Sequence, residues 1–211
     1  MLTFLVLDRP TAEWAELLAE SGSELYHAAQ IVTYIGLAGW MLAALLVCGL
    51  TISVSHWRQM VRDDMMKRIV LYADINFAFF AIGISSSLAW IIKNMIGRAR
   101  PRFMDDMGLL AFEPMSFLAR FASFPSGHSA TIGAAAMVLT LLVPRYAKLW
   151  LSVAFVGGVS RVVVQAHYMT DVVAGLVFGA GLTLWGARHL ARRDCMFRIE
   201  NGWLPNRRRP V

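Results

Sequence analysis

Five long runs of apolar residues dominate the sequence and restrict what the chain can fold into. The runs lie near Ile31–Val54, Ile69–Ile96, Pro125–Val143, Leu149–Ala166 and Thr170–Leu190. A helix needs about 20 predominantly apolar residues to cross a bilayer. Because 57% of the residues are hydrophobic and only 16% are charged, the composition departs from that of a soluble domain, in which about 25% are charged. We therefore expect an all-α, polytopic membrane helical bundle with five transmembrane helices.

Three regions follow from this pattern: residues 1–30, a transmembrane bundle over residues 31–190, and a basic cytoplasmic tail over residues 191–211. In the first region, Trp14, Leu17 and Leu18 recur at helical spacing among glutamates. This pattern predicts an amphipathic helix that lies on the membrane surface. The apolar stretch at the start of the chain is too short for the core of a secretory signal peptide.

The distribution of Lys and Arg predicts the orientation of the bundle. The basic residues gather between the first two spans and in the tail, for example Arg58, Arg62, Lys67, Arg68, Arg192, Arg193, Arg207, Arg208 and Arg209. The positive-inside rule places these segments in the cytoplasm and the N-terminus outside. It also explains the net charge of +6 without a nucleic-acid partner. The loop from Arg98 to Arg120 is basic yet falls outside, so it needs another reason, such as an anionic ligand.

Charged and polar residues from four segments are predicted to meet on this outer face. They are Lys93 and Arg100 at the end of the second span, the sequence FPSGHSA from Phe124 to Ala130, Arg161 and His167 around the end of the fourth span, and Asp171 at the start of the fifth. On a continuous helix, His167 would follow Arg161 by about 9 Å, at 1.5 Å per residue. An arginine among apolar residues is costly without an anionic partner. The alternative is a structural ion pair between Arg161 and Asp171, with His167 incidental.

This set of residues suits phosphoryl transfer. Lys93, Arg100 and Arg161 supply fixed positive charge for phosphate oxygens. Pro125 favours a helix start, and the free N–H groups of the first turn form an anion site that Gly127 leaves accessible. Two histidines can serve as nucleophile and general acid, and a carboxylate beside one of them would fix its tautomer. The chain has no Cys/His cluster with zinc spacing, so we expect neither a metal nor another cofactor.

Three motifs together resemble the signatures of the type 2 phosphatidic acid phosphatase family. They are Lys93 followed after six residues by Arg100-Pro101, then Pro125-Ser126-Gly127-His128, and finally Ser160-Arg161 with His167 and Asp171. The resemblance implies metal-independent dephosphorylation through a phosphohistidine. By position, it makes His167 the nucleophile, Asp171 its orienting partner and His128 the proton donor to the leaving oxygen. Phosphate ligands implied in the same way are Lys93, Arg100, Ser126, the Gly127 amide and Arg161.

The resemblance further implies an integral lipid phosphate phosphatase of bacterial type in the cytoplasmic membrane, with its site facing the periplasm. Substrates of such enzymes are undecaprenyl diphosphate, phosphatidylglycerol phosphate, phosphatidic acid or lipid A. The family usually has six spans, and a sixth would precede the surface helix. One alternative is a lipid phosphotransferase that uses the same site. Another is a non-enzymatic anion-binding or transport bundle, although binding alone would require neither histidine.

Several residues outside the motifs keep simpler interpretations. Arg98, Arg102 and Arg120 select a headgroup or are solvated loop charges, and the sequence favours neither. Asp74, within the second span, suggests an interhelical hydrogen bond. The glycines at 175 and 179 have the spacing of closely packed membrane helices, which we assign to packing within the chain rather than to dimerisation.

Overall fold

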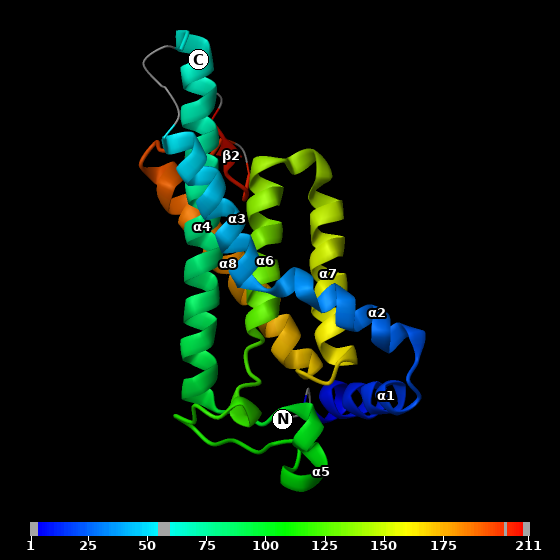
Figure 1. Ribbon diagram of the computed structural model, residues 1–211. Helices are drawn as coiled ribbons and strands as arrows, with labels where there is room; N and C mark the ends of the chain where they lie inside the picture. The colour runs from blue at the N-terminus through cyan, green and yellow to red at the C-terminus, as the bar shows by residue number, and fades with distance from the viewer. Residues whose placement is uncertain (1–3, 55–59, 201, 209–211) are drawn as a thin grey trace.

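The fold is a bundle of membrane helices with the N-terminal helices at one end and a short hairpin at the other (Figure 1). A computed structural model of the chain describes residues 4–54, 60–200 and 202–208. The helices of the bundle and its N-terminal extension are α1 (Arg9–Glu20), α2 (Glu24–Val32), α3 (Ala38–Ser53), α4 (Arg62–Ile96), α6 (Gly127–Leu142), α7 (Ala147–Val163) and α8 (Met169–Arg192).

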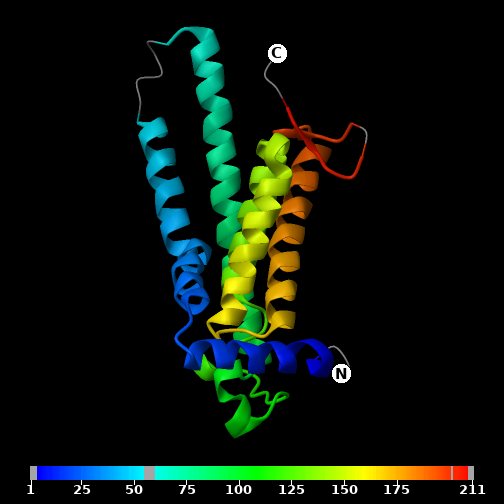
Figure 2. The same cartoon turned by 90° about the vertical axis from the view of Figure 1, so that its right-hand side faces the viewer.

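Short elements complete the chain at the two ends of the bundle. They are the π-helical turn η1 (Phe4–Asp8), the 3-10 turns η2 (Thr33–Gly36), η4 (Pro101–Phe103), η5 (Ala119–Phe121) and η6 (Pro144–Tyr146), the four-residue helix α5 (Met104–Met107), and the antiparallel strands β1 (Phe197–Arg198) and β2 (Asn206–Arg207). Figure 2 shows α1 lying across one end of the bundle, close to the loop that follows α4, while the chain ends at the opposite end. The expected all-α membrane bundle is confirmed, apart from the hairpin that the two-residue strands β1 and β2 form.

A helix forms at each of the five expected spans, but the five differ in length and continuity. Among the described residues, three helices are long and apolar enough to cross a membrane, namely α4, α7 extended by η6, and α8. The first expected span is instead a bent pair, Glu24–Gly36 and Ala38–Ser53, with an angle of 41° between its parts. Leu37 leaves the helical conformation, with φ −75° and ψ 113°, and so interrupts the helix.

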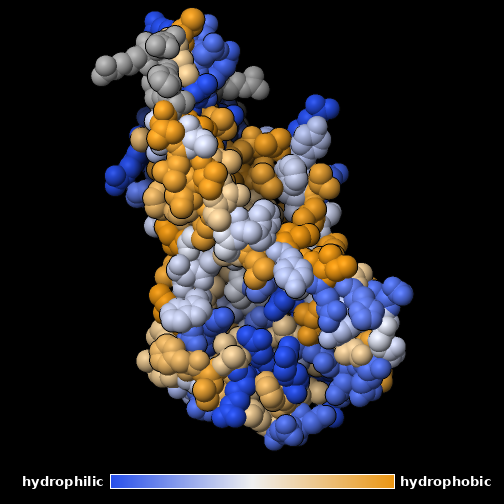
Figure 3. All heavy atoms as spheres, in the orientation of Figure 1, coloured by the Kyte–Doolittle hydropathy of each residue, from blue (hydrophilic) through white to orange (hydrophobic). Residues whose placement is uncertain are grey.

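The third expected span, α6, is short for a membrane helix. Its 16 residues extend about 24 Å at 1.5 Å per residue, less than the hydrocarbon thickness of about 30 Å. Most of its side chains are buried, and it packs against α4, α7 and α8. The surrounding helices therefore shield α6 from lipid. Figure 3 shows hydrophobic residues covering the shaft of the bundle and hydrophilic residues gathering at the end that carries α1.

Close packing of α6 on α8 brings the starts of these two helices together. A Cβ atom at Gly175 would meet the carbonyl oxygen of Ser126, and one at Gly179 would overlap the carbonyl oxygen of Ala130. The backbone N–H of Ser126 donates to the carbonyl oxygen of Asp171 at 3.0 Å. The predicted role of the two glycines in packing within the chain is confirmed, because larger residues would push the helices apart.

A left-handed glycine ends α4 and directs the following loop beneath the bundle. Gly97 has φ +67°, and its N–H donates to the carbonyl oxygen of Lys93 at 2.9 Å. A Cβ atom here would overlap the carbonyl oxygen of Glu113. Only glycine fits such a position without strain. The next residue, Arg98, is thereby turned inward rather than along the helix axis.

At the other end, the tail folds back onto the bundle. Arg207 of β2 forms an ion pair with Asp74 of α4. The predicted interhelical hydrogen bond of Asp74 was therefore wrong, because the partner of Asp74 lies on a strand and not on another helix. Residues Arg58 and Arg209, on which part of the orientation argument depends, lie outside the described residues.

Candidate active site

A pocket of about 460 Å³ opens between the start of α6, the end of α7 and the N-terminal helices. Its lining combines cations and a histidine with polar and aromatic side chains, namely Tyr26, Gln30, Thr33, Tyr34, Leu37, Arg100, Arg102, His128, Arg161, Val164 and Ala166. The structure thus brings together Arg100, His128 and Arg161, which come from three separate segments. The pocket lies at the end of the bundle that carries α1.

Within the described part of the chain, the cations around this pocket form no ion pair with a carboxylate. Lys93 interacts electrostatically with Arg100 and Arg161, and all three act on His128. Among the ion pairs of the described residues, Lys93, Arg100 and Arg161 take no part. Arg161 is buried and donates a hydrogen bond to the hydroxyl of Thr33. Its Nε and that of Arg100 are buried and have no hydrogen-bond partner among the residues that the structure describes. Such donors are suited to the oxygens of an anion.

The N-terminus of α6 lies beside the same pocket, which His128 of its first turn lines. Ser126 is the N-cap, and its hydroxyl oxygen accepts from the Ser129 N–H at 3.3 Å and from the Ser129 hydroxyl at 2.9 Å. A Cβ atom at Gly127 would meet nothing within 4 Å, so the space beside the first turn is open. Ser126 is fully buried and caps the helix, and its role as a phosphate ligand stays a prediction. The free N–H groups of the first turn and the helix dipole favour an anion here.

His167 lies in the connection between α7 and α8 rather than on a continuous helix. The helix α7 ends at Val163, and Gln165 has φ +53°. The expected position of His167 about 9 Å along the helix from Arg161 was therefore wrong. The turn instead folds His167 back, so that its backbone N–H donates a hydrogen bond to the carbonyl oxygen of Arg161 at 3.2 Å. The side chain is 3% exposed.

The Ser123 carbonyl fixes the tautomer of His167. Nδ1 of His167 lies 2.7 Å from this carbonyl oxygen, whereas Oδ2 of Asp171 lies 3.9 Å from Nδ1. A carbonyl oxygen only accepts hydrogen bonds, so Nδ1 carries the proton and Nε2 of the neutral ring carries the lone pair. Burial, with the charges of Arg161 and Arg100, lowers the pKa of His167 well below its usual 6.5. The ring is neutral at neutral pH.

Asp171 is surrounded by donors but does not contact His167 directly. Its carboxylate accepts from Nη1 of Arg98 at 2.5 Å, the Ser123 hydroxyl at 2.6 Å and the Tyr168 N–H at 3.0 Å. The last of these is half of a capping box that starts α8. Ser123 therefore connects Asp171 to His167, and the shorter ion pair of Asp171 is with Arg98. The alternative pairing of Arg161 with Asp171 is not formed in this structure.

Sequence reasoning missed two parts of the site. Arg98, which we left between a headgroup ligand and a solvated charge, is fully buried and paired with Asp8 and Asp171. The second part is the wall formed by α2 and η2, where a Cβ atom at Gly36 would lie 3.0 Å from Cβ of His128. The signals in the sequence were weak: a polar Thr33 three residues before Gly36 in an apolar run. Arg102 lines the pocket, whereas Arg120 lies over the ring of Phe121.

A family of known proteins matches the part of the chain that carries the motifs. The model of the PAP2 superfamily matches residues 74–194, which include every motif residue from Lys93 to Asp171. The chain belongs to the PAP2 superfamily. The match extends from the middle of α4 to just beyond the end of α8, so the N-terminal wall of the pocket lies outside it.

Two similar PAP2 relatives are named lipid A 1-phosphatase. The protein of Rhizobium johnstonii is 32% identical over 96% of this chain and 82% of its own length. The protein of Rhizobium etli is 32% identical over 96% of this chain and 85% of its own length. An acid phosphatase of Zymomonas mobilis is 33% identical over 42% of this chain and 34% of its own length.

A solved PAP2 structure has the same fold. It is the crystal structure of a transmembrane PAP2-type phosphatidylglycerolphosphate phosphatase from Bacillus subtilis, with a TM-score of 0.60. The likeness covers 90% of this chain and 86% of that chain at 21% sequence identity. It identifies the fold, including the polytopic membrane bundle.

The described residues contain no group of three or more His, Cys, Asp or Glu that could hold a metal ion. The positive charge at the pocket comes from side chains and from the start of α6. The chemistry of this donor set is therefore that of an anion site.

Proposed function

We propose that this protein is an integral membrane lipid phosphate phosphatase that hydrolyses the terminal phosphate of a lipid through a phosphohistidine on His167. The observation that carries the proposal is the hydrogen bond of 2.7 Å between Nδ1 of His167 and the Ser123 carbonyl oxygen. It leaves the Nε2 lone pair as the nucleophile. The surrounding cations make a phosphate the natural electrophile.

In the first step, Nε2 of His167 attacks phosphorus and the bond to the lipid oxygen breaks. Lys93, Arg100 and Arg161, with the N–H groups at Gly127, hold the phosphoryl oxygens. His128 donates a proton to the departing oxygen, which leaves as an alcohol or a shorter phosphate. Water then attacks the phosphohistidine, His128 takes the proton from that water, and inorganic phosphate is released. The side chains supply the charge stabilisation, so we expect turnover without a metal ion.

The substrate we propose is a lipid with its phosphate on a sugar headgroup, such as lipid A. Support comes from the two lipid A 1-phosphatases, which align with nearly the whole of this chain. The pocket wall is also suited to a sugar, because Tyr26, Gln30 and Tyr34 offer hydroxyl, amide and aromatic groups. Phosphatidylglycerol phosphate, phosphatidic acid and undecaprenyl diphosphate remain members of the test panel.

We also propose that the site faces the periplasm. The exposed cations Arg62, Lys67, Arg192 and Arg193 lie at the end of the bundle opposite the pocket, and such residues favour the cytoplasmic side. Native Cys195 is exposed in the tail. A Cys48→Ala variant should leave Cys195 unlabelled by an impermeant maleimide in intact cells, whereas Asp106→Cys in the loop should be labelled. The reverse pattern would invert the orientation.

The deciding experiment is phosphate release by the purified protein from a panel of lipid phosphates, in EDTA and without an added alcohol acceptor. We expect release from lipid A at a higher kcat/KM than from glycerophospholipid substrates, and the loss of release in His167→Ala. Phosphate that appears only when a lipid acceptor is supplied, as a new phosphorylated lipid, would indicate a phosphotransferase. Binding of these lipids with no release or transfer would indicate the anion-binding alternative. Activity that needs Mg²⁺ or Zn²⁺ would contradict metal independence.

A further inference from the structure

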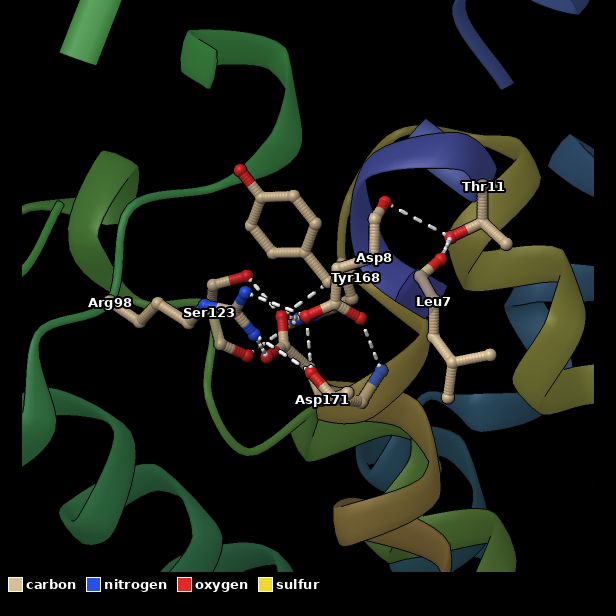
Figure 4. Close-up of polar contacts among 9 residues, drawn as sticks. Leu7, Asp8, Thr11, Arg98, Ser123, Tyr168 and Asp171 are labelled. Carbon is tan, nitrogen blue, oxygen red and sulfur yellow. Dashed lines mark hydrogen bonds and ion pairs between the residues drawn. The ribbon is translucent and has the colours of Figure 1, made fainter. Parts of the chain in front are cut away.

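Asp8 and Arg98 form a buried ion pair that connects the start of the chain to the active site. Both side chains are 0% exposed, and Nη2 of Arg98 lies 2.8 Å from Oδ2 of Asp8. The other guanidinium nitrogen, Nη1, lies 2.5 Å from Oδ1 of Asp171. Figure 4 shows Arg98 extending from the loop after α4 toward both carboxylates. One guanidinium thus joins the segment before α1 to the first turn of α8.

Asp8 also caps α8 from a distant part of the chain. Its Oδ1 accepts from the Thr170 N–H at 2.9 Å, and its Oδ2 accepts from the Thr170 hydroxyl at 2.6 Å. The Thr170 hydroxyl oxygen accepts in turn from Nη1 of Arg98 at 3.0 Å. The N–H groups of a first helical turn have no partner within their own helix, and a carboxylate is a favourable one. Asp8 therefore holds both Arg98 and the start of α8.

The chain of contacts continues to the ring of His167 through Ser123. The N–H of Ser123 donates to the backbone carbonyl oxygen of Arg98 at 3.0 Å, and its hydroxyl donates to Asp171 at 2.6 Å. The remaining polar group of Ser123, its carbonyl oxygen, accepts from Nδ1 of His167 at 2.7 Å. A shift of Arg98 or Asp171 would therefore move the group that sets the tautomer of His167.

Charge balance gives Asp8 a second effect. The guanidinium of Arg98 is shared by two carboxylates, which leaves a net negative charge close to a ring that becomes cationic when phosphorylated. Without the charge of Asp8, Arg98 would neutralise Asp171 alone. A buried ionic group is tolerated only with matched partners, so the arrangement is sensitive to the loss of either partner.

We propose that Asp8 and Arg98 are positioning residues for the phosphoryl-transfer step, so that docking of the N-terminal segment aligns His167. The inference rests on the proposed function for its kinetic consequences but not for its geometry. The N-terminal surface helix then has a role beyond membrane attachment, because it carries one end of the ion-pair chain. Misplacement of a reacting group by about 1 Å can cost on the order of 100-fold in rate.

The test compares Asp8→Asn with a matched control on α1, the helix that Asp8 precedes. Asp8→Asn keeps the shape of the side chain and removes its charge. The control is Glu13→Gln, which removes an exposed partner of Arg9 one turn along α1. We expect Asp8→Asn to lower kcat by roughly 10–100-fold and to change KM and inhibition by inorganic phosphate less than about two-fold, because the phosphate ligands are untouched. Arg98→Lys, which keeps one charge but cannot bridge two carboxylates, should lower kcat further.

A second readout does not depend on turnover. With ¹⁵N-labelled histidine, the ring nitrogens of His167 should report a single Nδ1–H tautomer in the wild type and a mixture in Asp8→Asn. An unchanged kcat and an unchanged tautomer in Asp8→Asn would overturn the inference. A loss of phosphate inhibition as large as the loss of kcat in Asp8→Asn would also overturn the inference, because the substitution would then have collapsed the pocket. A tautomer change in a protein that releases no phosphate would retain the positioning role and reject the proposed function instead.

Discussion

The cationic side chains at the two ends of the bundle differ in their burial. At the pocket end, Arg161 is buried and Lys93 and Arg100 are partly buried, and no carboxylate neutralises them among the described residues. At the tail end, Arg192 and Arg193 are exposed to solvent. Exposed charges are screened and act over a short range, whereas buried ones must find partners. The difference supports the proposal that the pocket end receives an anion, whereas the exposed cations of the tail end need no ligand.

Histidines at the two ends give the largest expected contrast. His167→Ala should lose turnover by roughly 10⁴-fold or more, the scale seen when the nucleophile of an enzyme is removed. His189→Ala changes an exposed histidine of α8 at the tail end and should leave kcat within about two-fold of the wild type, as expected for a surface substitution. Phosphate release from a lipid phosphate measures both. Comparable losses in the two variants would remove the distinction between the ends.

The motif residues of the candidate site were predictable because short stretches of sequence carry them. Lys93 with Arg100, Pro125 to His128, and Arg161 with His167 and Asp171 each lie within a dozen residues. The helical spans that follow from hydropathy bring these motifs to one end. Local pattern and global topology were therefore enough to place them, although the turn after Val163 that folds His167 back has no clear signal in the sequence.

The Asp8–Arg98 pair could not be predicted in the same way. Its members are 90 residues apart, and neither belongs to a periodic pattern that would indicate a shared surface. The bend at Leu37 was missed for a related reason, since hydropathy measures apolar content and not continuity of the helix. Likewise, the burial of α6 depends on neighbouring helices, which a count of its own residues does not show.

His128 and His167 should respond differently when the leaving group of the substrate is changed. His128→Ala should slow hydrolysis of an ordinary lipid phosphate by roughly 10²–10⁴-fold. With an aryl phosphate whose leaving group has a low pKa, the loss should shrink, because the departing oxygen is stable as an anion. His167→Ala should stay inactive with both substrates, because no phosphohistidine forms. Recovery of His167→Ala rather than His128→Ala on the aryl substrate would reverse the two assignments.

Removal of one cation at each end tests the charge comparison directly. Arg161→Gln should lower kcat/KM by roughly 10²–10³-fold, the range for loss of one preorganised donor. Arg192→Gln should have little effect, because that guanidinium is exposed. Inhibition by inorganic phosphate provides the control for binding, and it should weaken only in Arg161→Gln. A matching loss in Arg192→Gln would indicate a long-range field rather than a local site.

The same Arg161 substitution should change the pH dependence. Burial is the main cause of the lowered pKa of His167, and the charge of Arg161 is the next. The neutral ring is the nucleophile, so its contribution to kcat/KM is present above the pKa and is lost as the pH falls through it. In the wild type this loss should lie well below pH 6.5, and Arg161→Gln should move it upward. A ¹⁵N titration of His167 separates this ionisation from that of the substrate phosphate.

The smallest effect is expected at the ion pair of the tail end. Arg207→Gln removes the partner of Asp74, but the Arg207 side chain is 36% exposed, so solvent screens much of the interaction. The Asp74 side chain is only 12% exposed and loses its partner, so the free energy of unfolding should fall by about 1–3 kcal/mol, and kcat should not change. Denaturation in mild detergent and phosphate release measure the two quantities. A loss of activity here would mean that the hairpin acts on the pocket along α4, which would contradict the independence of the two ends.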